Sequence, residues 1–152
     1  MQNIIVRNIL PLPIYKKNIH QMFLDLAIGI ILALIPLLIV KKFFPSKQVV
    51  FWQFGLIIAA LAYVGFVLMN GKDIQNLPLE LGGLVLFSVL VFLSHKYSLY
   101  FLSLGWAMHI GWDSLLHSYT ATPYVPLHYI ESCIGFDIVI SAYVFWLARK
   151  GN

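Results

Sequence analysis

Five stretches of the chain are apolar over about the length that crosses a membrane, and short polar segments separate them. Their approximate bounds are 22–40, 49–69, 77–95, 98–117 and 127–147. A helix needs about 20 mainly apolar residues to cross the hydrocarbon core of a bilayer. Basic pairs follow the first and the last stretch, at Lys41–Lys42 and Arg149–Lys150. The pattern predicts an all-α fold, an integral membrane bundle of five transmembrane helices.

The composition supports a membrane protein of one domain. The 152 residues are 61% hydrophobic and 11% charged, whereas soluble domains carry about 25% charged residues. We expect a single transmembrane domain over residues 1–152, in contact with the lipid bilayer as a multi-pass protein of the cell membrane. The single cysteine, Cys133, excludes an internal disulfide. No basic stripe interleaves with exposed aromatic residues, which argues against nucleic-acid binding.

The basic residues are distributed unequally between the two sides of the predicted bundle. Five helices place the chain termini on opposite sides. The amino-terminal side holds Arg7, Lys16, Lys17 and Lys72, and the other side holds Lys41, Lys42, Lys47, Lys96, Arg149 and Lys150. Because cytoplasmic loops carry an excess of Lys and Arg, this difference places the carboxy terminus in the cytoplasm.

The acidic residues all fall on the amino-terminal side of the bundle: Asp25, Asp73, Glu80, Asp113, Glu131 and Asp137. At a rise of about 1.5 Å per residue, Asp137 on the fifth helix lies near the level of His109 on the antiparallel fourth helix. Tyr63 approaches the same level on the second helix. An ionised Asp at the centre of a spanning helix costs about 3 kcal/mol on insertion scales, so groups at this depth need partners. We therefore expect one shared polar site in this leaflet.

His109, Asp113 and His117 are spaced four residues apart and form one stripe on a helix. Residues at i and i+4 have Cβ atoms about 5–6 Å apart and can share a ligand. Histidine with carboxylate is a common ligand set for zinc and non-haem iron. One divalent metal such as zinc could bind His109 with Asp113, or Asp113 with His117, and take further ligands from Asp137, Glu80 or His128. The alternative is a buried hydrogen-bond network without metal.

Two further acids have alternative roles. Asp137 could be a metal ligand, a general base or a proton relay, or it could simply bond to a neighbouring polar side chain. Glu80 could serve the site, or it could complement the helix dipole near the start of the third helix. Asp25 and His20 are expected to be solvated at the start of the first helix. The connector 118–126 is expected to cover the polar cluster.

Pairs of small residues four apart predict close approach between helices in lipid. The pairs are Gly29/Ala33, Gly55/Ala59 and Ala107/Gly111.

The last third of the chain combines three sequence features. A His-x-x-Trp-Asp-x-x-x-His block comes first, then a connector with two prolines, then a Cys-x-x-x-Asp segment; the matching residues are His109, Trp112, Asp113, His117, Pro123, Pro126, Cys133 and Asp137. This arrangement resembles a domain-of-unknown-function family of small prokaryotic multi-pass membrane proteins. Tyr63-x-Gly65 and Glu80 are also similar, so the resemblance covers roughly two thirds of the chain. That family has no established activity.

A fainter resemblance is to membrane hydrolases of the alkaline ceramidase type. Those enzymes place a Ser, an Asp and several His around an intramembrane zinc, which implies metal-dependent hydrolysis of a lipid. They have seven spans, whereas five are predicted here. In this chain Asp113 lies between the outer two histidines, so their paired His-x-x-x-His on one helix is absent.

Three functional interpretations follow. In the first, an intramembrane His/Asp/Glu site binds a metal and hydrolyses a lipid or another small amphipathic substrate, with Asp113 and Asp137 as catalytic residues. In the second, the same cluster relays protons or binds a cation in a small transporter or channel subunit, which would need to form a homo-oligomer. In the third, the protein is a structural or accessory membrane subunit without catalysis.

The charge distribution generates a test of orientation. A fluorescent reporter fused to the carboxy terminus, of a kind that folds only in the cytoplasm, should be active. A fused enzyme active only outside the cell membrane should be silent. The opposite pattern would reverse the assignment of the two sides.

Overall fold

The computed structural model describes residues 18–71, 73–117, 124–126 and 128–151, and this part of the chain is helical without any strand. The long helices are α1 (Ile19–Phe43), α2 (Gln48–Asn70), α3 (Leu77–Lys96), α4 (Tyr100–Trp112) and α5 (Tyr129–Lys150). Short 3₁₀ turns, η2 (Pro45–Lys47) and η3 (Ile74–Asn76), precede α2 and α3. A π-helical turn, η4 (Asp113–His117), continues α4. The all-α prediction is confirmed.

Four helical segments are long and apolar enough to cross a membrane: Ile19–Phe43, Pro45–Asn70, Ile74–Lys96 and Tyr129–Lys150. The predicted span at 98–117 is less clear than the other four. Its α-helical part has 13 residues and rises about 20 Å, which is shorter than the hydrocarbon core of about 30 Å. The shortening arises because the helix changes to π geometry after Trp112.

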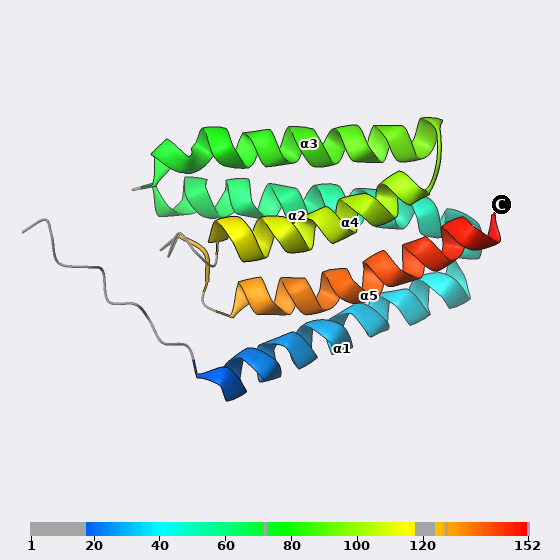
Figure 1. The fold of residues 1–152 in the computed structure, drawn as a ribbon, viewed down its shortest axis with the longest axis horizontal. Helices are drawn as coiled ribbons and strands as arrows, with labels where there is room; N and C mark the ends of the chain where they lie inside the picture. Colours follow the sequence, from blue (N-terminus) through cyan, green and yellow to red (C-terminus); the bar gives the residue numbers. More distant parts are fainter. Residues whose placement is uncertain (1–17, 72, 118–123, 127, 152) are drawn as a thin grey trace, which may run out of the picture.

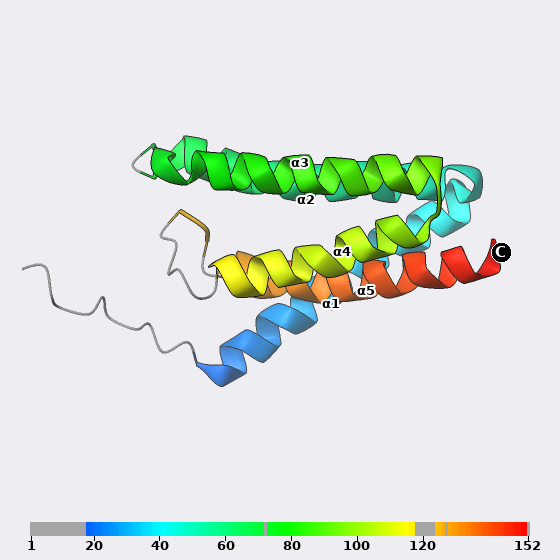
Figure 2. The same cartoon turned by 45° about the horizontal axis from the view of Figure 1, so that its top comes forward.

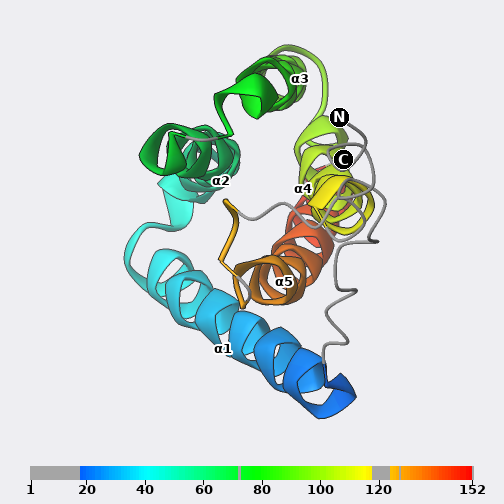
Figure 3. The same cartoon turned by 90° about the vertical axis from the view of Figure 1, so that its left-hand side faces the viewer.

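The helices run alongside one another, with α2 and α3 as one antiparallel pair and α4 and α5 as another (Figures 1 and 2). The beginning of α1 and the end of α5 lie at opposite ends of the bundle (Figure 1). The view along the bundle shows α1 lying across α5, apart from α3 and α4 (Figure 3). The first helix therefore packs mainly on the last.

Large aromatic and branched side chains fill the centre of the bundle, where the fully buried members include Trp52, Leu56, Phe87, Trp106 and Ile140. Many other apolar side chains face outward along the same helices, among them Ile31, Leu38, Phe54 and Val85. An outer surface of this kind suits contact with lipid rather than water. The apolar centre leaves polar side chains to gather at the end of the bundle where α2 ends and α3 begins.

Glycines allow α1 and α5 to approach until their backbones touch. A Cβ atom added at Gly29 would collide with the carbonyl oxygen of Ser132, and one added at Gly135 would collide with that of Leu26. The Ser132 hydroxyl also donates to the carbonyl oxygen of Asp25, at 3.2 Å. Close packing of small residues is a main source of helix association in lipid.

The small-residue prediction is confirmed for two of its three pairs. Gly29 and Ala33 are buried, and Gly55 lies against the Trp106 indole, whose Cζ2 would be 3.2 Å from an added Cβ. The prediction is wrong for Ala107/Gly111. Ala107 is exposed, and an added Cβ at Gly111 would meet nothing within 4 Å, because this face of α4 points away from the other helices.

The contact between α1 and α5 generates a test. Gly29→Ala or Gly135→Ala should lower the free energy of unfolding by about 1–3 kcal/mol, because backbone atoms must move to admit the methyl group. Gly82→Ala is the matched control, since an added Cβ there meets nothing within 4 Å and alanine favours a helix by about 1 kcal/mol. Thermal unfolding in detergent measures the difference. Equal stability of all three variants would contradict the backbone contact.

Candidate metal centre

Helices α4 and α5 bring one histidine and two carboxylates together inside the bundle. The Nδ1 of His109 lies 2.8 Å from Oδ2 of Asp137 and 3.6 Å from Oδ1 of Asp113. His109, Asp113 and Asp137 each offer one ligand atom, and these three atoms lie within 4.8 Å of one another. We call these three residues the inner cluster. They can therefore reach a common point, as the depth argument predicts.

All three residues of the inner cluster have a relative exposure of 0%. Two carboxylates in such surroundings are strongly unfavourable unless cations or hydrogen-bond donors compensate them. The hydrogen bond between His109 and Asp137 supplies part of this compensation. Within the described part of the chain, Oδ1 of Asp137 and Nε2 of His109 are buried and have no hydrogen-bond partner. These two atoms are therefore available to bind a ligand.

Tyr63 of α2 closes the inner cluster from a third helix. Its hydroxyl donates to Oδ1 of Asp113 at 2.6 Å. Its ring lies 5.9 Å from that of His109 and stacks on that of His117 with centroids 4.3 Å apart. From α3, the Phe87 ring lies 5.1 Å from that of His109. Aromatic rings therefore shield the cluster, and a phenol orients one of its carboxylates.

Glu80, His117, Trp112 and Tyr124 form a second polar group, which we call the outer group. Glu80 Oε1 accepts a hydrogen bond from the Tyr124 hydroxyl at 2.7 Å, and Oε2 accepts one from the Trp112 indole at 3.4 Å. His117 Nε2 lies 3.5 Å from Glu80 Oε1. Burial and the neighbouring Glu80 carboxylate raise the pKa of the Tyr124 phenol, which lies outside the spanning helices. The phenol is consequently protonated at neutral pH and can donate.

Five of the six predicted ligands thus divide between two groups. His109, Asp113 and Asp137 lie in the inner cluster, while His117 and Glu80 lie side by side in the outer group. The predicted stripe assumes regular α-helical geometry, but a π-helical turn runs from Asp113 to His117. Because π-helices have more residues per turn, His117 is rotated relative to its expected position.

The expectation that Asp25 is solvated is wrong. Asp25 is 2% exposed and accepts a hydrogen bond from Gln21 Nε2 at 2.9 Å. Its Oδ2 also lies 2.9 Å from Nδ1 of His128 at the start of α5. This carboxylate therefore links α1 to α5, and His128 is committed to it rather than to the candidate metal centre.

Tyr124 and Trp112 are site residues whose contacts the sequence argument did not identify. Tyr124 stands in a proline-containing connector at the end where the acids gather, which is the available sequence signal for it. Its contact with Glu80 agrees with the expectation that the connector covers the polar groups. Residues 118–123 of that connector, including Pro123, lie outside the described residues.

An apolar cavity of about 330 Å³ reaches the inner cluster from the side of the bundle. Its lining includes Pro36 of α1, Gly55 and Ala59 of α2, Trp106 of α4, and Cys133 and Asp137 of α5. Asp137 is the one acidic residue in this lining. An apolar molecule in the cavity would therefore lie directly beside a carboxylate of the cluster.

The Tyr63 hydroxyl provides a test of the inner cluster. Tyr63→Phe should lower the free energy of unfolding by about 1–3 kcal/mol, because it leaves the buried Asp113 carboxylate without this donor. Tyr97→Phe is the control, since Tyr97 is 65% exposed. Thermal unfolding in detergent measures both. A Tyr63→Phe variant as stable as Tyr97→Phe would contradict the importance of this hydrogen bond.

Comparisons with known proteins identify no relative of this chain. No family model matches it, nor does any curated protein or solved structure. The family resemblance noted in the sequence therefore stays a prediction, and the functional argument depends on the geometry of the two polar groups.

Proposed function

We propose that this chain is a membrane-embedded metal-dependent hydrolase of a lipid-like substrate, with His109, Asp113 and Asp137 holding one divalent cation. The observation that carries the proposal is the position of their three ligand atoms, all within 4.8 Å of one another and buried among apolar helices. Acidic clusters on protein surfaces are solvated, whereas this cluster lies where uncompensated charge is strongly unfavourable. A cation would compensate it.

The donor set suits zinc or another first-row divalent metal. One imidazole and two carboxylates leave a fourth position open for water or substrate, which is typical of catalytic rather than structural zinc sites. A metal at such a site supplies a Lewis acid and an acidic bound water. The Tyr63 hydroxyl holds the Asp113 carboxylate in place, and hydrogen bonds of this kind orient metal ligands in known sites.

The protein's own residues have distinct roles in this proposal. His109 and Asp113 lie one helical turn apart and would bind the metal from the same side. Asp137 comes from the facing helix, and its Oδ1 has no hydrogen-bond partner among the described residues. Asp137 therefore completes the ligand set, and its Oδ1 is available to accept a proton from the water that the metal would activate.

The proposed substrate class comes from the cavity beside Asp137. Its lining is mainly aliphatic and aromatic, and two of its members, Phe51 and Ile58, are exposed on the outer surface of the bundle. A hydrocarbon chain could enter this cavity laterally and bring an adjoining ester or amide bond to the cluster. The outer group, with Glu80 and Tyr124 at the end of the bundle, offers hydrogen bonds to a polar product.

The proposal includes the five-span topology. Helix α4 and its π-helical turn together would cross as the fourth span in chain order, in addition to the four clearer spans, which puts the carboxy terminus on the cytoplasmic side with Lys41, Lys42 and Lys47. The polar groups would then lie in the opposite leaflet.

A proton- or cation-coupled transporter is the second candidate, and a specific observation favours it. Titratable side chains follow one another from the inner cluster to the outer group, with Asp137, His109, Asp113 and Tyr63 joined by contacts of 2.8, 3.6 and 2.6 Å. Tyr63 then stacks on His117, which lies 3.5 Å from Glu80. Such a series of groups within a membrane could transfer protons.

The metal content of the purified protein tests the leading proposal. We expect about one equivalent of a divalent metal by elemental analysis, and its loss in Asp113→Asn, which keeps the side-chain shape but removes the charge. Asp73→Asn is the matched control, because Asp73 lies at the same end of the bundle and, within the described part of the chain, its carboxylate accepts a hydrogen bond from the exposed Asn70 side chain. Fatty-acid release from phospholipid vesicles should fall in parallel with metal content.

Other outcomes would separate the remaining interpretations. If the purified protein contains no metal and changes the internal pH of vesicles when a proton gradient is applied, transport would replace hydrolysis as the leading proposal. An Asp113→Asn variant that matches the parent in metal content, vesicle assays and thermal stability would indicate a structural role. Asp113→Leu should disturb folding in every case, because it also removes the hydrogen bonding.

A further inference from the structure

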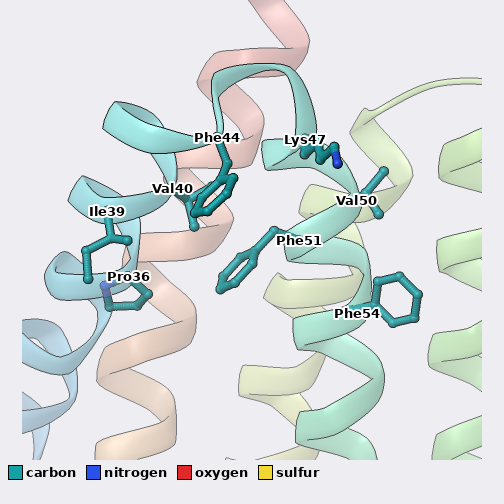
Figure 4. Close-up of a pocket in the computed structure, with 8 residues that line it drawn as sticks. All are labelled: Pro36, Ile39, Val40, Phe44, Lys47, Val50, Phe51 and Phe54. Carbon is teal, nitrogen blue, oxygen red and sulfur yellow. The ribbon is translucent and has the colours of Figure 1, made fainter.

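A deep apolar groove lies between α1 and α2, at the end of the bundle opposite the inner cluster. Its volume is about 550 Å³. Figure 4 shows Phe51 projecting from α2 toward α1, with Phe44 above it and Pro36 and Ile39 on the opposite wall. The groove exists because α1 packs on α5 and touches α2 mainly near their connecting turn. It faces outward, toward the surrounding lipid.

The groove adjoins the cavity beside Asp137. Pro36 and Phe51 line both spaces. From Lys47, directly before α2, to Ala59 within it, the combined lining extends about 18 Å at the helical rise. The acyl chains of one leaflet occupy half of a hydrocarbon core of about 30 Å, or about 15 Å. The length of the combined space therefore matches one acyl chain.

The end of the groove carries positive charge. Lys47 in turn η2 belongs to its lining, and Lys41 and Lys42 lie at the end of α1 on the same side. No Asp or Glu occurs between residues 41 and 72. Lys41 and Lys42 lie over the rings of Trp146 and Phe43, whereas Lys47 is exposed at the mouth of the groove. An anion at this position would meet a cation that no neighbouring acid in the sequence neutralises.

We infer that the groove binds one anionic phospholipid from the leaflet that surrounds Lys47. The phosphate contacts the Lys47 ammonium, one acyl chain lies between α1 and α2, and the chain end enters the cavity beside Asp137. A protein helix is a poorer occupant, because its diameter of about 10 Å would require roughly 1400 Å³ over the same length, more than the two cavities hold together. This inference does not depend on the metal site.

Native mass spectrometry of the detergent-purified full chain tests this inference. The probes are phosphatidylglycerol and phosphatidylcholine with identical acyl chains. We expect one phosphatidylglycerol to be retained, and Lys47→Gln to reduce its preference over phosphatidylcholine about fivefold, the effect of one basic residue near a charged surface. Lys96→Gln, which removes a charge on the same predicted side but outside the groove, should leave the preference unchanged.

A second pair of variants tests the groove itself. Val50→Trp places a large side chain in the lining and should abolish retention of the single lipid. Val85→Trp enlarges another outward-facing valine, on α3, which is 63% exposed against 49% for Val50, and should not abolish retention. Both variants keep a hydrophobic surface toward lipid, and thermal unfolding verifies that each is folded.

Several results would overturn the inference. Equal retention of the two lipids in the parent, or equal effects of Lys47→Gln and Lys96→Gln, would show that the lysine does not select a headgroup. Unchanged retention in Val50→Trp would show that the lipid lies elsewhere. Displacement of phosphatidylglycerol by inorganic phosphate alone would indicate an anion site that does not bind an acyl chain. A dimeric parent protein that becomes monomeric in Val50→Trp would identify a second copy of the chain as the occupant.

Discussion

The hydrogen bond between His109 and Asp137, 2.8 Å long and fully buried, joins two helices in a medium that offers them little other reason to associate. Apolar side chains gain little by moving from lipid to a helix interface, so polar contacts and close packing must hold a membrane bundle together. Tyr63 extends the connection to α2 through Asp113. Glu80 extends it to α3 through Trp112 and Tyr124. Four helices therefore meet at linked polar groups.

The helix α1 is held by a different device. It contributes no side chain to either polar group and instead packs its backbone against α5 at Gly29 and Gly135. The buried Asp25 strengthens this contact through His128 and through its backbone oxygen. The division explains why α1 can stand apart from α2 and leave a groove between them. Polar contacts hold the inner cluster and the outer group together, while small residues hold α1, which forms one wall of the groove, against α5.

The level of each polar group could be predicted from the sequence, because the helical rise relates residue number to depth once the spans are identified. That argument correctly brought Asp137 to His109 across two antiparallel helices. It did not anticipate the π-helical turn over Asp113–His117, because the depth argument assumes regular α-helical geometry throughout. It also placed Asp25 in water, because hydropathy at the start of α1 does not show that Gln21 and His128 cover it. The helical rise gives the depth of a residue but not which helix lies beside it, so such contacts could not be predicted from the sequence.

The pairing of α1 with α5 also determines the order in which the bundle can assemble. Helix α1 finds its main partner in α5, and the chain between Phe43 and Lys150 must be synthesised in the interval. At ribosomal rates of about 5–20 residues per second, that delay is roughly 5–20 s. During this time the glycine face of α1 lies open to lipid or to whatever protein conducts membrane insertion. Helix α5 thus closes the bundle, and a nascent chain that stops before Gly135 lacks both Phe136 of the cavity lining and the carboxylate of Asp137.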